Sequence, residues 1–403
     1  MFLELETTNL MKKVFTFIIS FIRVSFQKLA IINLHGVSLL FRPFLNSKCI
    51  WIIMERGFEA QDNAWHFFKY IKDSHPEIDA RYAIVKSSPD YATNLSPYKR
   101  DVIEYGSLKY FIVLFNASYL ISTHLQTYVY FNTIYAWLSH SIFDIKAKKV
   151  FLQHGITHNF HRSFEYPQID VQLFISGAEN EHRLLTTIFK YPPEIAQYTG
   201  LARFDNLFSY QKKRQVLIMP TWRAKYAGYS RNDFEKTDYF LAYKEILTDK
   251  NLEKTLEQQD YEVLFYNHYE FQKYNQSFEA LCGDRVKLVR FGEKKVQELL
   301  KDASLLVTDY SSVYYDFFYM KKPIIFFKLN KEEFEASQYG VDYDDPHNFG
   351  YVSYTARETI NSIISVINKD CSFEDRFNEH HSKVFTLYDQ KNCERTYNAI
   401  VKL

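Results

Sequence analysis

Short apolar segments alternate with helix-forming segments along most of this chain, and the alternation occurs in two successive sets. The first set predicts strands at residues 49–54, 82–85, 119–122, 149–153 and 171–175, with helices at 63–71 and 110–115. The second set predicts strands at residues 216–219, 261–266, 286–290, 305–307 and 324–327, with helices at 239–256 and 295–300. This alternation is typical of parallel sheets covered by helices on both faces.

The 403 residues are too many for one ordinary core and suit two domains. The expected architecture is α/β, with two Rossmann-like domains facing across a cleft and ligands at the carboxyl ends of the strands. We expect an amphipathic segment at 1–48, a first domain at 49–212 and a second at 213–370. A C-terminal helix at 371–403 is expected to pack back on the first domain.

Charge and cysteine content exclude several classes of protein. The net charge is +1, so no overall field attracts nucleic acid, and any anion site must be local. The four cysteines are scattered without metal-ligand spacing and are expected to be reduced thiols of a cytosolic protein. No GxxxxGK[ST], GxGxxG or GxSxG motif occurs, which disfavours Walker-type, dinucleotide and esterase sites. The sequence therefore indicates neither a cofactor nor a metal site.

The amino terminus carries basic residues around an apolar run. Lys12 and Lys13 precede the run at 14–22, and Arg23 ends it. This run is shorter than the roughly 20 residues that a membrane-spanning helix needs. We predict an amphipathic helix in a membrane surface, with these cations and Lys28 toward the lipid headgroups. The alternative is a helix packed on the first domain, and both place the protein on the cytosolic side.

The stretch at residues 305–327 carries the strongest chemical signal. Its predicted strand runs into the sequence TDYSS, which contains Asp309, Ser311 and Ser312, and an aromatic helical segment with Asp316 follows. Small hydroxyl residues where a strand becomes a helix leave backbone N–H groups at the positive end of the helix dipole, which favours a phosphate. A plain N-cap role for either serine is the alternative.

Other predicted strands also end in polar residues. His154 and Gly155 follow the strand at 149–153, where the histidine suits a general base and the glycine permits close backbone approach. Thr221 and Arg223 follow the strand at 216–219, and an arginine there can bind two phosphate oxygens. His268 follows the strand at 261–266. The alternatives are a structural histidine at 154 and a surface ion pair for Arg223.

Residues 200–205 (GLARFD) follow a further extended segment. They predict a turn in which Arg203 pairs with Asp205. A surface salt bridge that orders a loop is favoured here over contact with a ligand.

The ordered set of motifs resembles the CDP-glycerol glycerophosphotransferase family, which builds teichoic acids and related capsule phosphopolymers. The resemblance covers about residues 50–400. Its motifs are residues 57–63 (GFEAQDN), 153–155 (QHG), 200–205, 220–223 (PTWR), 267–268 (NH), 308–312 with Asp316, 322–323 (KP) and 389–395 (DQKNCER). The chain departs from the family pattern at Gln153, where tryptophan is usual, at Tyr269, where proline is usual, and at Gln390 and Cys393 in the tail.

The resemblance implies a GT-B fold with the nucleotide in the second domain. It also implies roles for the predicted site residues. His154 is expected as the catalytic base and His268 as its partner at the activated phosphate. The expected substrate-binding residues are Arg223, Ser311, Ser312, Asp309, Asp316, Gly155 and Thr221.

The function implied is transfer of glycerol phosphate, or a related alditol phosphate, from CDP-glycerol or CDP-ribitol. The acceptor would be a hydroxyl of a lipid-linked teichoic-acid or capsule polymer at the cytoplasmic face of the membrane. Two alternatives are a GT-B glycosyltransferase that uses a nucleotide sugar and an inactive scaffold at the membrane surface.

Overall fold

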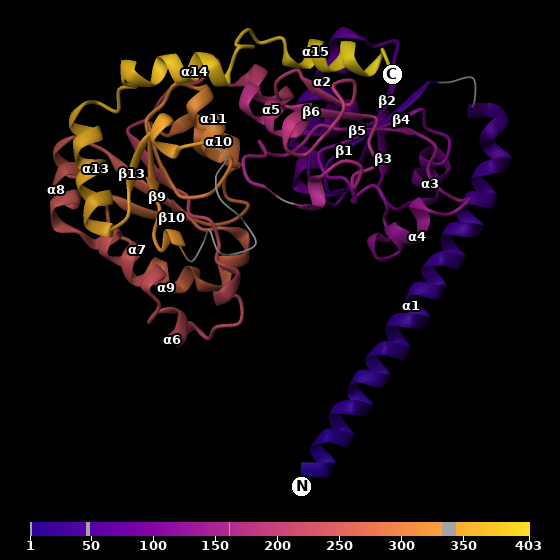
Figure 1. The fold of residues 1–403 in the computed structure, drawn as a ribbon, viewed down its shortest axis with the longest axis horizontal. Helices are drawn as coiled ribbons and strands as arrows, with labels where there is room; N and C mark the ends of the chain where they lie inside the picture. Colours follow the sequence, from indigo (N-terminus) through magenta and orange to yellow (C-terminus); the bar gives the residue numbers. More distant parts are fainter. Residues whose placement is uncertain (1, 46–48, 161, 333–343) are drawn as a thin grey trace. The chain divides into compact units, whose positions relative to one another are not determined.

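The computed structural model describes residues 2–45, 49–160, 162–332 and 344–403 of the chain. It divides into two compact units. The first contains Met1–His154, Asp170–Ile175 and Thr396–Leu403, and the second contains Gly155–Ile169 and Ser176–Arg395. Both are built from parallel strands with helices packed around them (Figure 1).

The first sheet has seven strands in the order β3-β2-β1-β4-β5-β6-β7. They are β1 (Ile50–Met54), β2 (Asp79–Ile84), β3 (Val102–Glu104), β4 (Tyr119–Ser122), β5 (Lys148–Phe151), β6 (Leu173–Ser176) and β7 (Ala196–Tyr198). β1 pairs in parallel with both β2 and β4, so the order of strands reverses between β1 and β4. Ligands of such sheets bind beyond the carboxyl ends of the strands at this switch point. The helices before β8 are α1 (Phe2–Leu45), α2 (Asn63–Ser74), α3 (Leu108–Leu114), α4 (Tyr135–Ser139) and α5 (Glu179–Thr187).

The second sheet has six parallel strands in the order β10-β9-β8-β11-β12-β13, with its switch point between β8 and β11. They are β8 (Gln215–Ile218), β9 (Glu262–Tyr266), β10 (Val286–Val289), β11 (Leu305–Thr308), β12 (Ile324–Phe327) and β13 (Tyr351–Ser353). The helices that follow β8 are α6 (Arg231–Phe234), α7 (Asp238–Thr248), α8 (Lys250–Gln258), α9 (Asn275–Glu279), α10 (Val296–Asp302), α11 (Val313–Tyr319), α13 (Ala356–Asn368), α14 (Asn378–Val384) and α15 (Asn392–Ile400).

The two parallel sheets confirm the predicted α/β class with Rossmann-like sheets. The structure differs from the prediction at residues 239–256, where two helices replace one. Asp249 has extended backbone, and its carboxylate accepts hydrogen bonds from the N–H groups of Asn251 and Leu252 at 2.9 Å each. It therefore acts as the N-cap that starts α8. The predicted C-terminal helix is likewise divided, into α14 and α15.

Alternate residues of the second sheet enter two separate apolar clusters. Val216 and Ile218 of β8 belong to a cluster with residues of α7, α8 and α13, whereas Leu217 belongs to one with residues of α10, α11 and α14. Because helices cover both faces of the sheet, the side chains at odd and at even positions along a strand are all buried. This burial accounts for the unbroken apolar runs in the sequence.

One side of α1 packs on the first unit. Ile31 is buried in a cluster with residues of α3, and the ring of His35 meets that of Phe115 edge-on at 5.0 Å. The ammonium group of Lys28 lies 5.3 Å from the ring centre of Trp137, so this predicted headgroup contact is a contact with the protein instead. Arg23 is exposed and does not interrupt the helix. The side chains of Lys12 and Lys13 lie outside the described residues.

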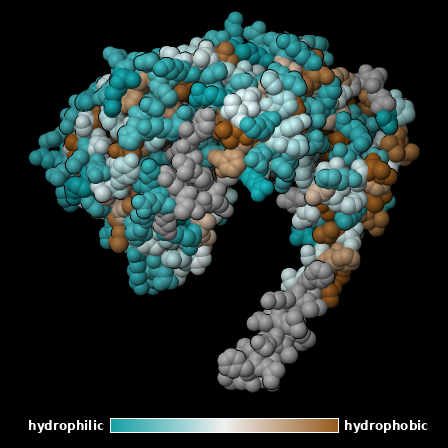
Figure 2. Space-filling view, in the orientation of Figure 1, coloured by the Kyte–Doolittle hydropathy of each residue, from teal (hydrophilic) through white to brown (hydrophobic). Residues whose placement is uncertain are grey.

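The other side of α1 exposes large apolar side chains, which Figure 2 shows in brown where it colours the helix. Ile18, Ile22, Phe26, Leu40 and Phe44 are between 47% and 74% exposed. Among the described helices, the Ile18–Leu45 part of α1 is long and apolar enough to span a membrane by length and composition. The prediction counted only the uninterrupted run at 14–22 and missed this length.

Candidate active site

Two loops meet at the switch point of the second sheet, one after β8 and one after β11. Asp309 follows β11 directly and is fully buried. Its carboxylate accepts hydrogen bonds from the N–H of Thr221 at 2.9 Å, from Thr221 Oγ1 at 2.6 Å and from Arg223 Nη2 at 2.8 Å. Arg223 Nη1 also donates to the Thr221 carbonyl at 3.0 Å. Asp309 thus holds Thr221 and Arg223 in place through donors of the protein itself.

Two cations share an aromatic ring beside this loop. The Arg223 guanidinium lies 5.5 Å from the ring centre of Tyr310, and the Lys328 ammonium lies 3.7 Å from the same centre. Lys328 follows β12, so its backbone leaves the same edge of the sheet as Arg223. Lys328 was not among the predicted site residues, although it is a cation that follows a predicted strand, as Arg223 is. Because Asp309 is paired with Arg223, the two cations and this carboxylate leave one net positive charge, which suits an anion at this edge.

Ser311 and Ser312 connect β11 to α11. Ser312 occupies the N-cap position of α11, but its hydroxyl makes no capping hydrogen bond. This observation disfavours a plain N-cap role for Ser312. Gly155 belongs to the same unit, and a Cβ atom there would lie 2.4 Å from Ser312 Oγ. A larger residue at 155 would therefore displace the Ser312 hydroxyl from its position.

His268 lies after β9, the neighbour of β8 in the sheet. The N–H of Glu270 donates to His268 Nδ1 at 3.3 Å, and the ring is parallel to that of Trp222 with centres 6.1 Å apart. Because Nδ1 accepts this hydrogen bond, the neutral ring carries its proton on Nε2. His268 thus has an Nε2–H group able to donate to a ligand oxygen.

The predicted surface pair of Arg203 with Asp205 is wrong. Arg203 instead pairs with Asp316 of α11, and both side chains are buried. Arg203 Nε and Nη2 donate to the two carboxylate oxygens of Asp316, each at 2.7 Å. Asp205 instead accepts the N–H groups of Asn392 and Cys393 at 2.9 Å and so caps α15. The carboxylates of Asp205 and Asp316 therefore both accept hydrogen bonds from donors in distant parts of the chain.

In the first unit, a constrained turn presents His154. Gln153 has φ 60°, in the left-handed region that non-glycine residues rarely adopt. Its carbonyl accepts from Asn63 Nδ2 at 2.7 Å, and its own Nε2 donates to the Ile175 carbonyl at 2.6 Å. Backbone in such regions persists where surrounding contacts hold it, often at functional sites. His154 itself is exposed, with Nδ1 3.2 Å from the Thr123 carbonyl oxygen.

Two residues that were not predicted, His124 and Arg56, extend the site beside His154. The His124 ring stacks on that of His154, with centres 4.3 Å apart and planes 11° apart. Arg56 Nε donates to His124 Nε2 at 3.0 Å. Arg56 and His124 lie just beyond β1 and β4, the strands at the switch point of the first sheet. Their position after strand ends was the signal available in the sequence.

Glu55 organises the loop that carries Arg56. Its buried carboxylate accepts hydrogen bonds from the N–H groups of Asp62 at 2.8 Å and Trp65 at 3.2 Å, at the start of α2. Burial and then the neighbouring Asp62 carboxylate raise the pKa of Glu55 to about 8. The loop from β1 to α2 is therefore fixed around a buried acid.

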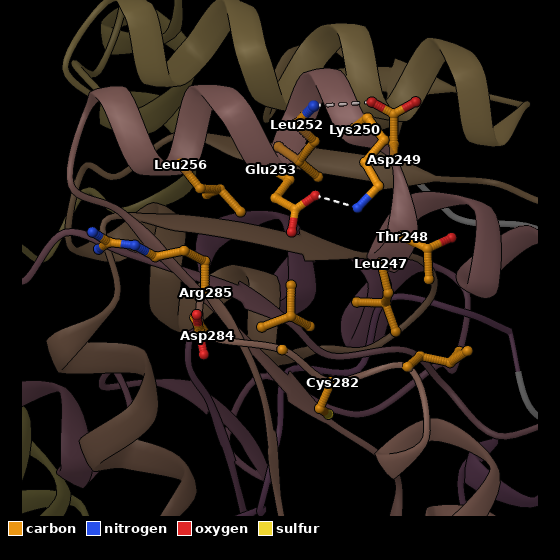
Figure 3. A pocket seen from close by; sticks show the side chains of 13 residues that line it. Leu247, Thr248, Asp249, Lys250, Leu252, Glu253, Leu256, Cys282, Asp284 and Arg285 are labelled. Carbon is orange, nitrogen blue, oxygen red and sulfur yellow. Dashed lines mark hydrogen bonds and ion pairs between the residues drawn. The ribbon is translucent and has the colours of Figure 1, made fainter.

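A cavity of about 240 Å³ in the second unit lies away from these residues (Figure 3). Its lining comes from the junction of α7 and α8, where Lys250 pairs with Glu253 at 2.7 Å, and from residues 281–286, which lead into the amino end of β10. None of the predicted site residues lines this cavity. Among the described residues, no three His, Cys, Asp or Glu side chains form a group suited to a metal ion.

A family profile and two curated relatives point to teichoic-acid synthesis proteins. The profile of the CDP-glycerol:poly(glycerophosphate) glycerophosphotransferase family matches residues 36–402. The minor teichoic acid biosynthesis protein GgaB of Bacillus subtilis (strain 168) is 30% identical over 376 residues, covering 89% of this chain and 40% of GgaB. The teichoic acid poly(glycerol phosphate) polymerase of the same organism is 22% identical over 384 residues, covering 86% of this chain and 48% of the polymerase. The chain spans less than half the length of these relatives.

Solved structures show the same fold. The wall teichoic acid polymerase TagF aligns with a TM-score of 0.64 and 15% identity, covering 95% of this chain and 99% of that chain. The complex of S. aureus MnaA with UDP aligns with a TM-score of 0.54 and 13% identity, covering 88% of this chain and 96% of that chain. The TagF match confirms the expected GT-B class. With the profile match over most of its length, the chain belongs to the CDP-glycerol:poly(glycerophosphate) glycerophosphotransferase family.

Proposed function

We propose that this protein transfers glycerol phosphate, or a related alditol phosphate, from a CDP-linked donor to a hydroxyl of a lipid-linked teichoic-acid or capsule polymer. The observation that carries the proposal is the cationic carboxyl edge of the second sheet. Arg223, Lys328 and His268 follow three of its strands, and Ser311 and Ser312 follow a fourth. A diphosphate needs such a set of cations and hydrogen-bond donors. TagF, a relative in fold, was solved in variant form after a soak with CDPG, which supports a CDP-linked donor.

The proposed roles follow from the hydrogen bonds of each residue. Arg223 binds the diphosphate while Asp309 and Thr221 fix its orientation. His268 donates its Nε2–H to a phosphate oxygen. Asp309 and Asp316 act through the arginines that they hold, because protein donors already occupy their carboxylates. Gly155 lets its loop approach Ser312.

The proposed reaction is a substitution at the β-phosphorus of the donor. The acceptor hydroxyl oxygen forms a bond to this phosphorus, and the bond to the bridging oxygen of CMP breaks. His154, which directly precedes Gly155 in the chain, accepts the hydroxyl proton. Arg223 and His268 offset the charge that develops on the leaving CMP.

Product analysis tests this proposal directly. The purified full-length protein is incubated with a synthetic lipid-linked acceptor and with CDP-glycerol, CDP-ribitol or a UDP-sugar, and the lipid products are analysed by mass spectrometry. We expect the acceptor mass to increase by one or more alditol phosphate units, with release of CMP. Transfer of a sugar would support the glycosyltransferase alternative, and the absence of binding to every CDP compound would support the scaffold.

We further propose that α1 attaches the protein to the cytoplasmic face of the membrane as a peripheral helix. Its exposed apolar side chains, including Phe26 and Phe44, lie opposite the side that packs on the first unit through Ile31 and His35. A helix with one apolar side turned away from its own protein suits burial at the level of the lipid headgroups. Such an attachment would bring the enzyme to a lipid-linked acceptor.

Vesicle binding tests the role of α1. The protein should float with phosphatidylglycerol-containing vesicles and be released by alkaline carbonate, as expected for a peripheral helix. The double variant Phe26→Glu, Phe44→Glu should remain in the soluble fraction, because it places two charges in the apolar surface. Leu241→Glu, a substitution at an exposed leucine of α7, is the control and should float normally. Retention after carbonate treatment would indicate a spanning helix instead.

A further inference from the structure

Arg56, His124 and His154 form a connected set at the carboxyl edge of the first sheet. They follow β1, β4 and β5, which are adjacent in the sheet. Arg56 Nε lies 3.0 Å from His124 Nε2, and the two imidazole rings stack with centres 4.3 Å apart. Thr123 links the rings, because its Oγ1 lies 2.9 Å from His124 Nδ1 and its carbonyl oxygen lies 3.2 Å from His154 Nδ1.

The hydrogen bonds determine which nitrogen of each ring carries a proton. Arg56 Nε can only donate, so His124 Nε2 accepts and the proton of the neutral ring is on Nδ1, where Thr123 Oγ1 receives it. A carbonyl oxygen can only accept, so His154 donates its Nδ1–H to Thr123. The lone pair of neutral His154 is therefore on Nε2. A general base in this turn would act through that atom.

The surroundings of His124 favour its neutral form. Arg56, just after β1, contacts the His124 ring through Nε and is itself close to an acid. Arg56 Nη1 lies 3.8 Å from Glu59 Oε1. Burial, then His154 and then Arg56 lower the pKa of His124 to about 2. His124 thus stays neutral at neutral pH.

We propose that Arg56 and His124 are positioning residues that fix the ring plane of His154 for catalysis, while the Thr123 carbonyl sets its Nε2-basic tautomer. The proposal rests on the proposed function of His154 as the base. Arg56 fixes the tautomer of His124, Thr123 ties both rings to one residue, and the stack prevents rotation of the His154 ring. A base held in this way need not reorient before it takes the proton from the hydroxyl of the acceptor.

Histidine NMR tests the arrangement without turnover. In full-length protein labelled with ¹⁵N-histidine, long-range ¹H–¹⁵N spectra distinguish the two neutral tautomers, and the His124→Phe spectrum assigns the His124 signals. We expect His124 to be the neutral Nδ1–H tautomer between pH 8 and pH 5. In Arg56→Met the donor to Nε2 is lost, so the Nδ1–H tautomer of His124 should no longer be the exclusive one. Identical His124 signals in Arg56→Met and in the unsubstituted protein would overturn the proposal.

Kinetics test the consequence for catalysis. His124→Phe keeps a flat ring in the stack but removes both nitrogens, so we expect kcat to fall by about 10- to 100-fold, the range that misplaced groups cause. The Kd of the CDP donor should not change. Arg56→Met, at a side chain that is 38% exposed, should lower kcat in the same direction and guards against misfolding of His124→Phe. His75→Phe is the matched control, since His75 also stacks on a ring of the first unit, that of Tyr397 at 3.7 Å.

The His154→Ala variant distinguishes failure of the positioning role from failure of the proposed base. If it loses turnover while His124→Phe and Arg56→Met both keep the kcat and pH profile of the unsubstituted enzyme, the positioning role is wrong and the proposed base stands. If His154→Ala itself turns over normally, the proposed base is wrong, and the positioning role falls with it.

Discussion

Replacing His154 with alanine is expected to lower kcat by about 10²- to 10⁴-fold, the usual contribution of a general base. The Kd of the CDP donor should not change, because the donor-binding residues proposed above belong to the second unit, whereas His154 belongs to the first. The turn that carries His154 is held by Asn63 and Ile175 through the backbone and side chain of Gln153. Loss of the imidazole should therefore leave the turn intact and remove only the proton acceptor.

The measurement is single-turnover transfer from CDP-glycerol, with donor Kd from calorimetry. His140→Ala is the matched control: His140 is another exposed histidine of the first unit, and its Nδ1 also lies near a backbone carbonyl, 2.9 Å from that of Ala136. The control should retain full activity. Normal turnover by His154→Ala would remove this residue from the mechanism, and a loss of donor affinity would assign it to binding instead.

The fold could be predicted from the sequence because its strands are short, apolar and buried on both faces. The predicted strands at 119–122 and 324–327 coincide with β4 and β12. The sequence pattern did not show the break at Asp249. There the carboxylate caps a new helix, although the pattern of apolar residues continues through this position. The length of the apolar part of α1 was also missed, because only the uninterrupted apolar run before Arg23 was compared with the length of a membrane span.

Candidate site residues could be predicted only where a chemically distinctive side chain directly follows a recognisable strand. Asp309 and Arg223 are 86 positions apart, and Arg203 and Asp316 are 113 apart, so neither ion pair has a local sequence signal. Asp309 and Asp316 were predicted to bind the substrate because the family resemblance implies acidic residues near the donor, and the sequence does not show which protein groups donate to them. His124 was overlooked because its partners, Arg56 and His154, lie on neighbouring strands of the sheet but far away in the sequence.

Replacing Arg223 with alanine is expected to weaken donor binding and to destabilise the second unit at the same time. Loss of charge-assisted hydrogen bonds to phosphate should raise the Kd of CDP by about 10- to 100-fold. The substitution also leaves Asp309, whose side chain is 0% exposed, without its cation. Removing one partner of a buried ion pair typically costs about 3–5 kcal/mol of unfolding free energy. Arg223→Lys keeps a charge but cannot donate to Asp309 and to the Thr221 carbonyl from one planar group, so intermediate effects are expected.

A matched control separates affinity from stability. Lys322 is a second buried basic residue of the same unit, and its Nζ donates to the carbonyls of Leu300 at 2.8 Å, Lys301 at 2.7 Å and Ala303 at 2.8 Å. It precedes β12 and thus lies at the amino edge of the sheet, opposite the edge that carries Arg223. Lys322→Met should lower the free energy of unfolding in urea yet leave the Kd of CDP unchanged by calorimetry. Equal loss of CDP affinity in both variants would mean that Arg223 acts only through folding, whereas a loss confined to Arg223→Ala identifies it as a donor ligand.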